Sequence, residues 1–234
     1  MVSKKSLLIS AVILFVFLPA CSGTSASEQI YNHLEKAVEL EETFEKQQNP
    51  IVELEQKEQE IYKKIIELSM DDYDKIKELS EKALSNIEKR EKKIELENES
   101  MQASKEEFMK MEDKLADLEK ESVQKKADEM FAAMTDRYDA YEKLHEAYSK
   151  SLSMEKELYT MLQDKELEQK KLSDHISGLN DSYQKVIDAN KEFNDLTNEY
   201  NELKKEFYKA ADIDVSYENT EEKKEKSPES EKNE

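Results

Sequence analysis

The stretch YDKIKELSEKALSNIEKREKKIELENESMQASKEEFMKMEDKLADL, from Tyr73 to Leu118, decides the fold of this chain. Two rows of residues alternate along it at steps of three and four. One row is Tyr73, Ser80, Ile87, Ile94, Met101, Phe108 and Leu115, and the other is Ile76, Ala83, Arg90, Glu97, Ser104, Met111 and Leu118. Seven heptads without a slip predict a long helix with a left-handed supercoiled seam, and hence an all-α protein.

Three polar residues interrupt the second row in its middle: Arg90, Glu97 and Ser104. Core rows of coiled coils are normally apolar, and a polar residue in one lowers stability. We therefore expect the seam to be loosely specified at these positions. Such a seam suits either a surface for a partner or a rod that bends.

The composition agrees with long helices and disfavours several classes of protein. Charged residues make up 39% of the chain, which has two glycines, three prolines and no tryptophan. Phosphate-binding loops, nucleophile elbows and dinucleotide folds need more glycines than this. The formal net charge of −20 repels phosphates and anionic lipid headgroups, so we expect no binding to nucleic acid.

Turn signals divide the first half of the body. Ser27 is a predicted N-cap of the first helix. Asn49-Pro50 interrupts the apolar stripe, which predicts one kinked helix or two helices in series. Ser69-Met70-Asp71-Asp72 predicts a turn before the heptad stretch, with an aspartate as the cap of the helix that follows.

Two further turns are predicted near Ser122 and near Asp164, because a five-residue step breaks the apolar phase at each place. Segments of about 40 to 50 residues would be about 60 to 75 Å long and could fold back as antiparallel neighbours. The result would be an elongated helical bundle that resembles spectrin-type repeats. A single continuous helix with phase slips is the alternative. Asn190 occupies a core position of the last segment, where it would fix the pairing register.

The two ends of the chain differ from the helical body, which we assign to residues 28–211. Lys4 and Lys5 precede an apolar run of about a dozen residues, too short for the roughly 20 that span a bilayer. Residues 1–20 are therefore a predicted secretory signal peptide. Residues 212–234 carry nine acidic and four basic residues, and we predict a disordered acidic tail.

The sequence Leu18-Pro19-Ala20-Cys21 resembles the bacterial lipobox, in which a peptidase cuts before the cysteine. The resemblance implies that Cys21 carries a thioether-linked diacylglycerol and becomes the first residue, followed by a flexible tether up to residue 27. Buried acyl chains contribute about 0.8 kcal/mol per methylene, so two chains would anchor the protein firmly to the membrane. The alternative is a signal peptide that is cut elsewhere and leaves a free thiol.

Catalytic and metal-binding residues are not indicated. His33, His145 and His175 lie far apart in the sequence, and none has a second histidine or a cysteine at ligand spacing. Carboxylates are so frequent that no pair stands out for acid–base chemistry. We expect no catalytic residue, no metal and no cofactor apart from the diacylglycerol on Cys21.

One aromatic cluster is a candidate binding face. Tyr138, Tyr141, His145 and Tyr148 fall on one side of a predicted helix. Tyrosine rings can stack on sugars while their hydroxyls form hydrogen bonds, so this face could hold a glycan or a partner. The simpler interpretation, which we favour, is that these residues form the core stripe of their helix.

The lipobox leader, the charged helical body and the acidic tail together resemble the cell-wall-binding lipoprotein family (YkyA-like) of Bacillus-type Gram-positive bacteria. The resemblance implies a protein on the outer face of the cytoplasmic membrane, facing the cell wall. The family is sometimes linked with hydrolase activity, but we find no residues here that could perform it. We expect a non-enzymatic protein that binds peptidoglycan or envelope proteins, with self-association through the coiled coil as a further possibility. The alternatives are a scaffold or regulatory subunit for another envelope protein, and a cell-wall hydrolase.

Overall fold

The computed structural model describes residues 24–215, so the predicted leader, the lipobox with Cys21 and most of the acidic tail lie outside the described residues. The helices are α1 (Ala26–Leu40), α2 (Glu42–Ile66), η1 (Met70–Asp72, a 3-10 helix), α3 (Tyr73–Met109), α4 (Glu112–Leu115), α5 (Glu121–Met161) and α6 (Gln169–Ala210). Residues 24–215 contain no strand, which confirms the all-α prediction. Within the same range, no helix combines the length and apolar character needed to cross a membrane.

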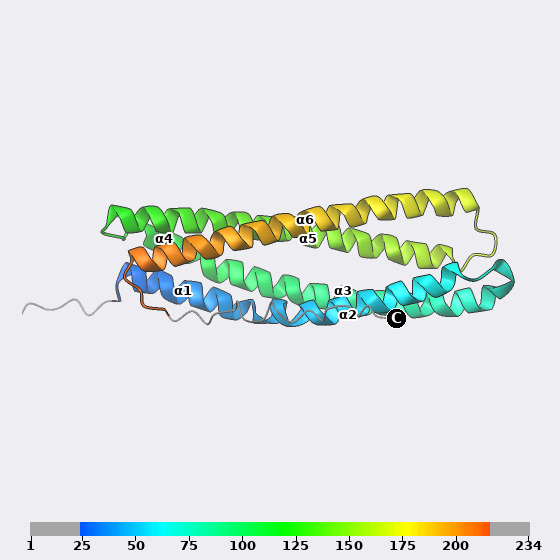
Figure 1. Cartoon of the computed structure of the whole chain (residues 1–234). Coiled ribbons are helices and arrows are strands. Elements are labelled where there is room, and N and C mark those ends of the chain that lie inside the picture. The colour runs from blue at the N-terminus through cyan, green and yellow to red at the C-terminus, as the bar shows by residue number, and fades with distance from the viewer. Residues whose placement is uncertain (1–23, 216–234) are drawn as a thin grey trace, which may run out of the picture.

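The helices form an elongated antiparallel bundle of two hairpins (Figure 1). α1 and α2 follow each other along α3, α5 pairs with α6, and α3 packs against α5. We call the end where α1 begins and α6 ends the proximal end, and the end that holds η1 the distal end. The chain therefore reverses direction at the three predicted places, and the continuous-helix alternative is wrong.

Most of the residues that begin the helices differ from those predicted. The N-cap of α1 is Ser25, whose hydroxyl accepts a hydrogen bond from the Glu28 amide at 3.2 Å, whereas Ser27 lies inside the helix. At the first turn, Ser69 caps η1 and forms a capping box with Asp72. Asp72 occupies the N-cap position of α3, as predicted, but its side chain makes no capping hydrogen bond there. α5 and α6 begin after Lys120 and Glu168, which form no side-chain cap, so Ser122 and Asp164 are not caps.

The break in the first long segment lies at Glu41, and Pro50 lies inside α2. The hydroxyl of Ser100 on α3 donates to the Leu40 carbonyl at 2.5 Å and accepts from the Phe44 amide at 3.1 Å. These two backbone groups are four residues apart and would bond each other in a regular helix. A side chain inserted into this ladder is a known cause of a kink, and it explains why the break is not at the proline.

The heptad stretch is not one helix throughout. α3 ends at Met109, nine residues before Leu118, and the chain continues through the single turn of α4. Hydrogen bonds between residues three apart tighten this segment, including those from the Met111 amide to Phe108 and from the Lys114 amide to Met111. The tighter winding keeps the apolar residues of the segment directed toward the core.

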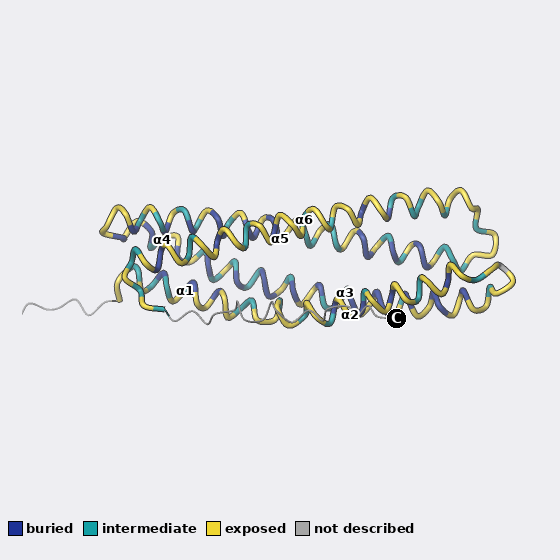
Figure 2. The backbone as a smooth tube through the Cα atoms, in the orientation of Figure 1, coloured by how far each residue is buried: buried dark blue, intermediate teal, exposed yellow. Residues whose placement is uncertain are grey.

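Apolar side chains form two separate clusters. Buried positions recur along every long helix of the bundle (Figure 2). The proximal cluster is rich in aromatic rings and draws residues from α1, α3, α4, α5 and α6. The distal cluster contains Ile51, Ile65, Ile76, Leu79, Ala83, Ile87, Ile94, Leu152 and Tyr159, which belong to α2, α3 and α5. α6 contributes no residue to the distal cluster, so the bundle is closed by α6 only at its proximal end.

The polar residues in the middle of the heptad stretch are buried and paired, so the seam is not loosely specified there. Arg90, Glu97 and Ser104 are 4%, 5% and 0% exposed. The hydroxyl of Ser104 lies 2.7 Å from that of Tyr138, and Glu97 accepts a hydrogen bond from Gln48 at 2.5 Å. Arg90 is described with the candidate site below.

Two expectations for the last segment are also wrong. Asn190 is exposed and accepts a hydrogen bond from Asn194, so it does not occupy a core position. The ordered part extends past residue 211: Asp212 has a φ of 54°, and the Ile213 amide bonds to the Tyr208 carbonyl in a Schellman-type cap. Residues 216–234 of the predicted tail lie outside the described residues.

The buried carboxyl of Glu97 should make stability depend on pH. Burial, followed by the charge of Glu55, raises the pKa of Glu97 from 4.5 to about 8. The folded state therefore holds this proton more tightly than the unfolded state, and the resulting stabilisation is complete below about pH 4.5 and lost as the pH rises to about 8. We expect Glu97→Gln to unfold with a free energy higher than wild type by on the order of 2–4 kcal/mol near pH 8.5, and to differ little near pH 5, in urea titrations.

Glu99→Gln is the matched control, because it removes one exposed carboxyl from the same helix. It should leave the pH dependence unchanged. Glu58, whose pKa is also raised to about 8, keeps part of the dependence in every one of these proteins. An identical loss of stability in Glu97→Gln and wild type between the two pH values would contradict the assignment.

Candidate functional site

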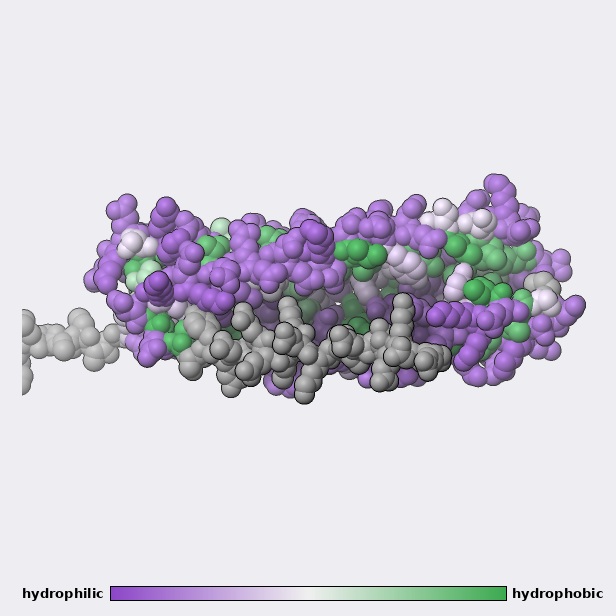
Figure 3. Space-filling view, viewed as in Figure 1, coloured by the Kyte–Doolittle hydropathy of each residue, from purple (hydrophilic) through white to green (hydrophobic). Residues whose placement is uncertain are grey.

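A cleft of about 470 Å³ lies between α2 and α6 in the distal half of the bundle. Its walls are α2 and the first half of α6, and its floor is formed by α3 and α5. Hydrophobic side chains reach the surface beside a hollow in this half of the molecule (Figure 3). Among them are Tyr183 and Ile187 of α6, which are 37% and 60% exposed.

The cleft exists because α6 packs on α5 and leaves α2 uncovered. Ile176, Leu179 and Val186 of α6 line the cleft, but of these three only Leu179 is buried. Gly178 allows the close approach of α6 to α5, since a Cβ atom there would lie 3.2 Å from the terminal methyl of Met154. An apolar helix face that is left half covered in this way is typical of a binding surface.

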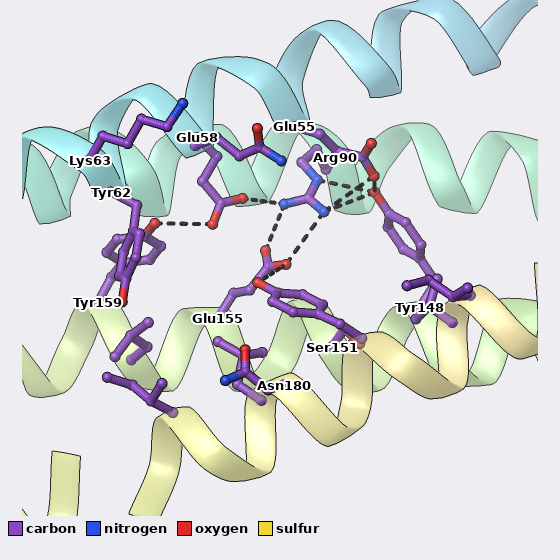
Figure 4. A pocket seen from close by; sticks show the side chains of 17 residues that line it. Glu55, Glu58, Tyr62, Lys63, Arg90, Tyr148, Ser151, Glu155, Tyr159 and Asn180 are labelled. Atoms are coloured by element: carbon purple, nitrogen blue, oxygen red, sulfur yellow. Dashed lines mark hydrogen bonds and ion pairs between the residues drawn. The ribbon is translucent and has the colours of Figure 1, made fainter. Parts of the chain in front are cut away.

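Arg90 of α3 lies at the floor of the cleft and joins three helices (Figure 4). Its Nη1 donates to Glu58 of α2 and, at 2.6 Å, to Oε2 of Glu155 of α5. Its Nε and Nη2 donate to the hydroxyl of Tyr148 at 3.2 and 2.9 Å. The Tyr148 hydroxyl donates in turn to Glu55 at 2.6 Å. The guanidinium is therefore surrounded by acceptors that compensate for its burial.

Two more tyrosines complete this network. The Tyr159 hydroxyl donates to Oε1 of Glu58 at 3.1 Å, and the Tyr183 hydroxyl donates to Oε1 of Glu155 at 3.0 Å. Because Tyr183 belongs to α6, the network links all the helices that surround the cleft. Both carboxylates are nearly inaccessible, with side-chain exposures of 10% for Glu58 and 2% for Glu155.

The electrostatics of the floor follow from this burial. Desolvation, with the charge of Glu155 acting in the same direction, raises the pKa of Glu58 to about 8. Burial acts to lower the pKa of Arg90, but the neighbouring Glu155, Tyr148 and Glu58 outweigh it and the pKa is raised. Burial therefore favours the neutral form of Glu58 more than that of an exposed glutamate. The cleft is lined by three acidic residues, Glu55, Glu58 and Glu155, and by two basic ones, Arg90 and Lys63.

Glu58 and Glu155 form the kind of carboxyl pair that acid–base chemistry requires, since their surroundings differ. Their oxygens, however, bind Arg90, Tyr159 and Tyr183, and little of either side chain is accessible to a substrate. The geometry favours a structural role for the pair, as a floor that holds the tyrosines in place.

The predicted aromatic face is divided by the structure. Tyr138 and Tyr141 are 1% and 3% exposed and belong to the proximal cluster, which agrees with the core interpretation. The ring of His145 lies 6.3 Å from that of Tyr141. Tyr148 alone reaches the cleft. These four residues therefore form no shared surface for a glycan.

Two of the three histidines, His33 and His175, lie within hydrogen-bond distance of other groups of the chain. His33 Nδ1 lies 2.7 Å from Glu107 Oε1, and His175 Nε2 lies 2.8 Å from the Met154 carbonyl. Residues 24–215 contain no group of three or more histidine, cysteine, aspartate or glutamate side chains placed to hold a metal ion.

The network at the floor was missed by the sequence analysis, although a signal was present. Arg90 was recognised as a charged residue in a core row. Glu58 lies in the apolar stripe of its helix between Leu54 and Ile61, and Glu155 follows Leu152 at the same spacing. Two acidic residues and one basic residue in three core stripes would have predicted a buried ionic cluster.

Removing the positive charge at the floor should destabilise the bundle. Arg90→Met leaves Glu155 and Glu58 buried without their cation, and breaking a buried pair in this way costs about 3–5 kcal/mol. We expect a loss of that size in the free energy of unfolding measured with urea. The triple variant with Glu58→Gln and Glu155→Gln should recover part of it, because the uncompensated charges are removed together. A single variant within about 1 kcal/mol of wild type would show that the network contributes little.

Comparisons with known proteins place the chain in a family. The sequence pattern of the YkyA family, described as "Putative cell-wall binding lipoprotein", matches residues 25–210. The "Uncharacterized lipoprotein YkyA" of Bacillus subtilis (strain 168) is 38% identical over 196 residues, which cover 84% of this chain and 88% of that protein.

A solved structure, that of a conserved protein of unknown function from Staphylococcus aureus, has a TM-score of 0.69 and 16% sequence identity with this chain. The match covers 80% of this chain and 98% of the other, and at this identity it supports the elongated helical fold alone. The family match spans most of the body, and the relative from Bacillus subtilis supports it independently. The chain therefore belongs to the YkyA family of lipoproteins.

Proposed function

We propose that this protein is a lipid-anchored, non-enzymatic helical rod on the outer face of the cytoplasmic membrane, where it binds the peptidoglycan of the cell wall. Cys21 would carry the diacylglycerol anchor. The observation that carries the proposal is the position of the cleft, which lies in the half of the bundle remote from the start of α1, the helix that follows Cys21 in the sequence.

The dimensions of the rod support this arrangement. α1 begins at Ala26, five residues after the predicted lipidation site, so the tether is short. Glu55, at the start of the cleft, lies 29 residues further along two nearly continuous helices. At 1.5 Å per residue, this places the cleft roughly 40 Å from the anchored end. A protein held at Cys21 would present the cleft toward the wall.

The residues that line the cleft support recognition of a specific ligand, as opposed to nonspecific electrostatic attraction between the protein and the envelope. With a formal net charge of −20, the surface would repel the anionic groups of an envelope. The cleft has apolar and aromatic walls with a few polar groups, as ligand-binding sites commonly do. The family description supports the wall as the source of the ligand.

A protein partner in the envelope is the second candidate, and a specific observation favours it. Ile187 and Tyr183 of α6, which line the cleft, are 60% and 37% exposed. Large apolar side chains exposed beside a cleft are common at protein interfaces. In that case the protein would act as a scaffold or regulatory subunit.

Sedimentation with purified sacculi tests the wall-binding proposal. We expect soluble protein that begins at Ser22 to sediment with washed, insoluble peptidoglycan and to leave no soluble muropeptides in the supernatant. This form keeps every described residue of the bundle.

Protein spun without sacculi gives the background for this test. Protein that stays in solution with sacculi present would contradict wall binding, and capture of a defined envelope protein in its place would support the scaffold. Release of muropeptides would contradict the non-enzymatic assignment.

The anchor is tested separately with Cys21→Ser. Without the thiol no thioether to diacylglycerol can form, so we expect the variant to move from the membrane fraction to the medium when cells are fractionated. Mass spectrometry of the wild-type protein should show an acylated N-terminal cysteine. A variant that stays in the membrane fraction would indicate that the apolar leader is retained and is itself the anchor.

A further inference from the structure

Each wall of the cleft carries one side-chain amide and one tyrosine ring. Gln59 on α2 and Asn180 on α6 are exposed, and neither side chain makes a hydrogen bond with another residue of the range 24–215. Tyr62 on α2 and Tyr183 on α6 supply an aromatic ring on each side. In Figure 4, Tyr62 projects from α2 and Asn180 from α6, the two helices that form the walls of the cleft.

The ring of Tyr183 is held in place before any ligand binds. Its hydroxyl donates to Glu155 at 3.0 Å, and Glu155 is held by Arg90 at 2.6 Å. The ring nevertheless remains accessible, since Tyr183 is 37% exposed. A fixed aromatic surface loses little conformational entropy on binding, which favours affinity.

The charge balance limits the ligands that this cleft would select. The charged residues that line the cleft are of both signs, Glu55, Glu58 and Glu155 against Arg90 and Lys63, and their formal charges differ by one at most. A strongly anionic or cationic ligand would therefore gain little from the site. Free side-chain amides offer both donors and acceptors, and so match a ligand rich in hydroxyl and amide groups.

We propose that the cleft binds a short segment of an uncharged, N-acetylated glycan strand, whose sugar rings lie against Tyr62 and Tyr183. Gln59 and Asn180 bind the hydroxyl and acetamido groups from opposite sides, and the acetamido methyl contacts Ile187. The volume of about 470 Å³ is within the usual range of small-molecule sites, roughly 300–1,000 Å³. This inference rests on the proposed wall binding and names the sugar backbone as the component that is bound.

Calorimetric titration with tetra-N-acetylchitotetraose, an uncharged β-linked oligosaccharide, tests the inference. The protein is the soluble form that begins at Ser22. We expect saturable binding by wild type and roughly tenfold weaker binding by Tyr183→Ala and by Asn180→Ala. Tyr183→Phe, which keeps the ring but loses the bond to Glu155, should be intermediate. Cellotetraose, which has the same linkage without acetamido groups, should bind more weakly than the N-acetylated probe.

Asn201→Ala is the matched control, because Asn201 is an exposed amide on α6 outside the cleft. It should bind as wild type does. Asn180 is exposed, so its variant should fold normally, and thermal unfolding followed by circular dichroism checks this for each protein.

The possible outcomes separate this inference from the proposed function. Unchanged affinity in both Asn180→Ala and Tyr183→Ala would show that the sugar binds elsewhere, and equal affinity for cellotetraose would show that acetamido groups are not recognised. Either result overturns the inference. Sedimentation with sacculi without binding to the oligosaccharide would overturn the inference and leave wall binding in place. Failure in both assays would overturn both.

Discussion

The distal half of this bundle depends on the need to neutralise one buried guanidinium. Arg90 projects from the middle of α3 and binds carboxylates from α2 and α5. A charge at this depth is tolerated only when its donors are paired, so the three helices must keep one register relative to each other. Apolar contacts alone would allow the helices to slide by a turn, because one isoleucine or leucine packs much like another.

The same network explains why the bundle is open on one side. Arg90 on α3 donates its hydrogen bonds to groups on α2 and α5, and the distal apolar cluster is built by the same three helices. α6 joins the Arg90 network only through the hydroxyl of Tyr183 and otherwise packs on α5, so its apolar residues in this half are left without a counterpart on α2. In the proximal half, by contrast, Phe193, Tyr200 and Phe207 of α6 are buried in the aromatic cluster and close the bundle.

The sequence was sufficient for the helical fold and for the places where the chain turns. Heptad spacing in Tyr73–Leu118 and the two five-residue steps depend on local periodicity, which is visible in one dimension. The kink at Glu41 was not predictable in this way, because it depends on Ser100, which is 59 residues away in the sequence. The cleft was missed for a related reason. The buried ionic cluster can be recognised only when Glu58, Arg90 and Glu155 are considered together, because each of them alone is one charged residue among many.

The insertion of Ser100 between Leu40 and Phe44 has a mechanical consequence for a molecule as slender as this bundle. Apart from Pro50, which has no N–H, the rest of α1 and α2 can bend only if direct backbone hydrogen bonds lengthen. At Glu41 the Ser100 hydroxyl already lies between the carbonyl and the amide, and it can rotate as they move. A force along the long axis of the bundle should therefore bend α1 and α2 at Glu41 first, and the helices should straighten again when the force is removed.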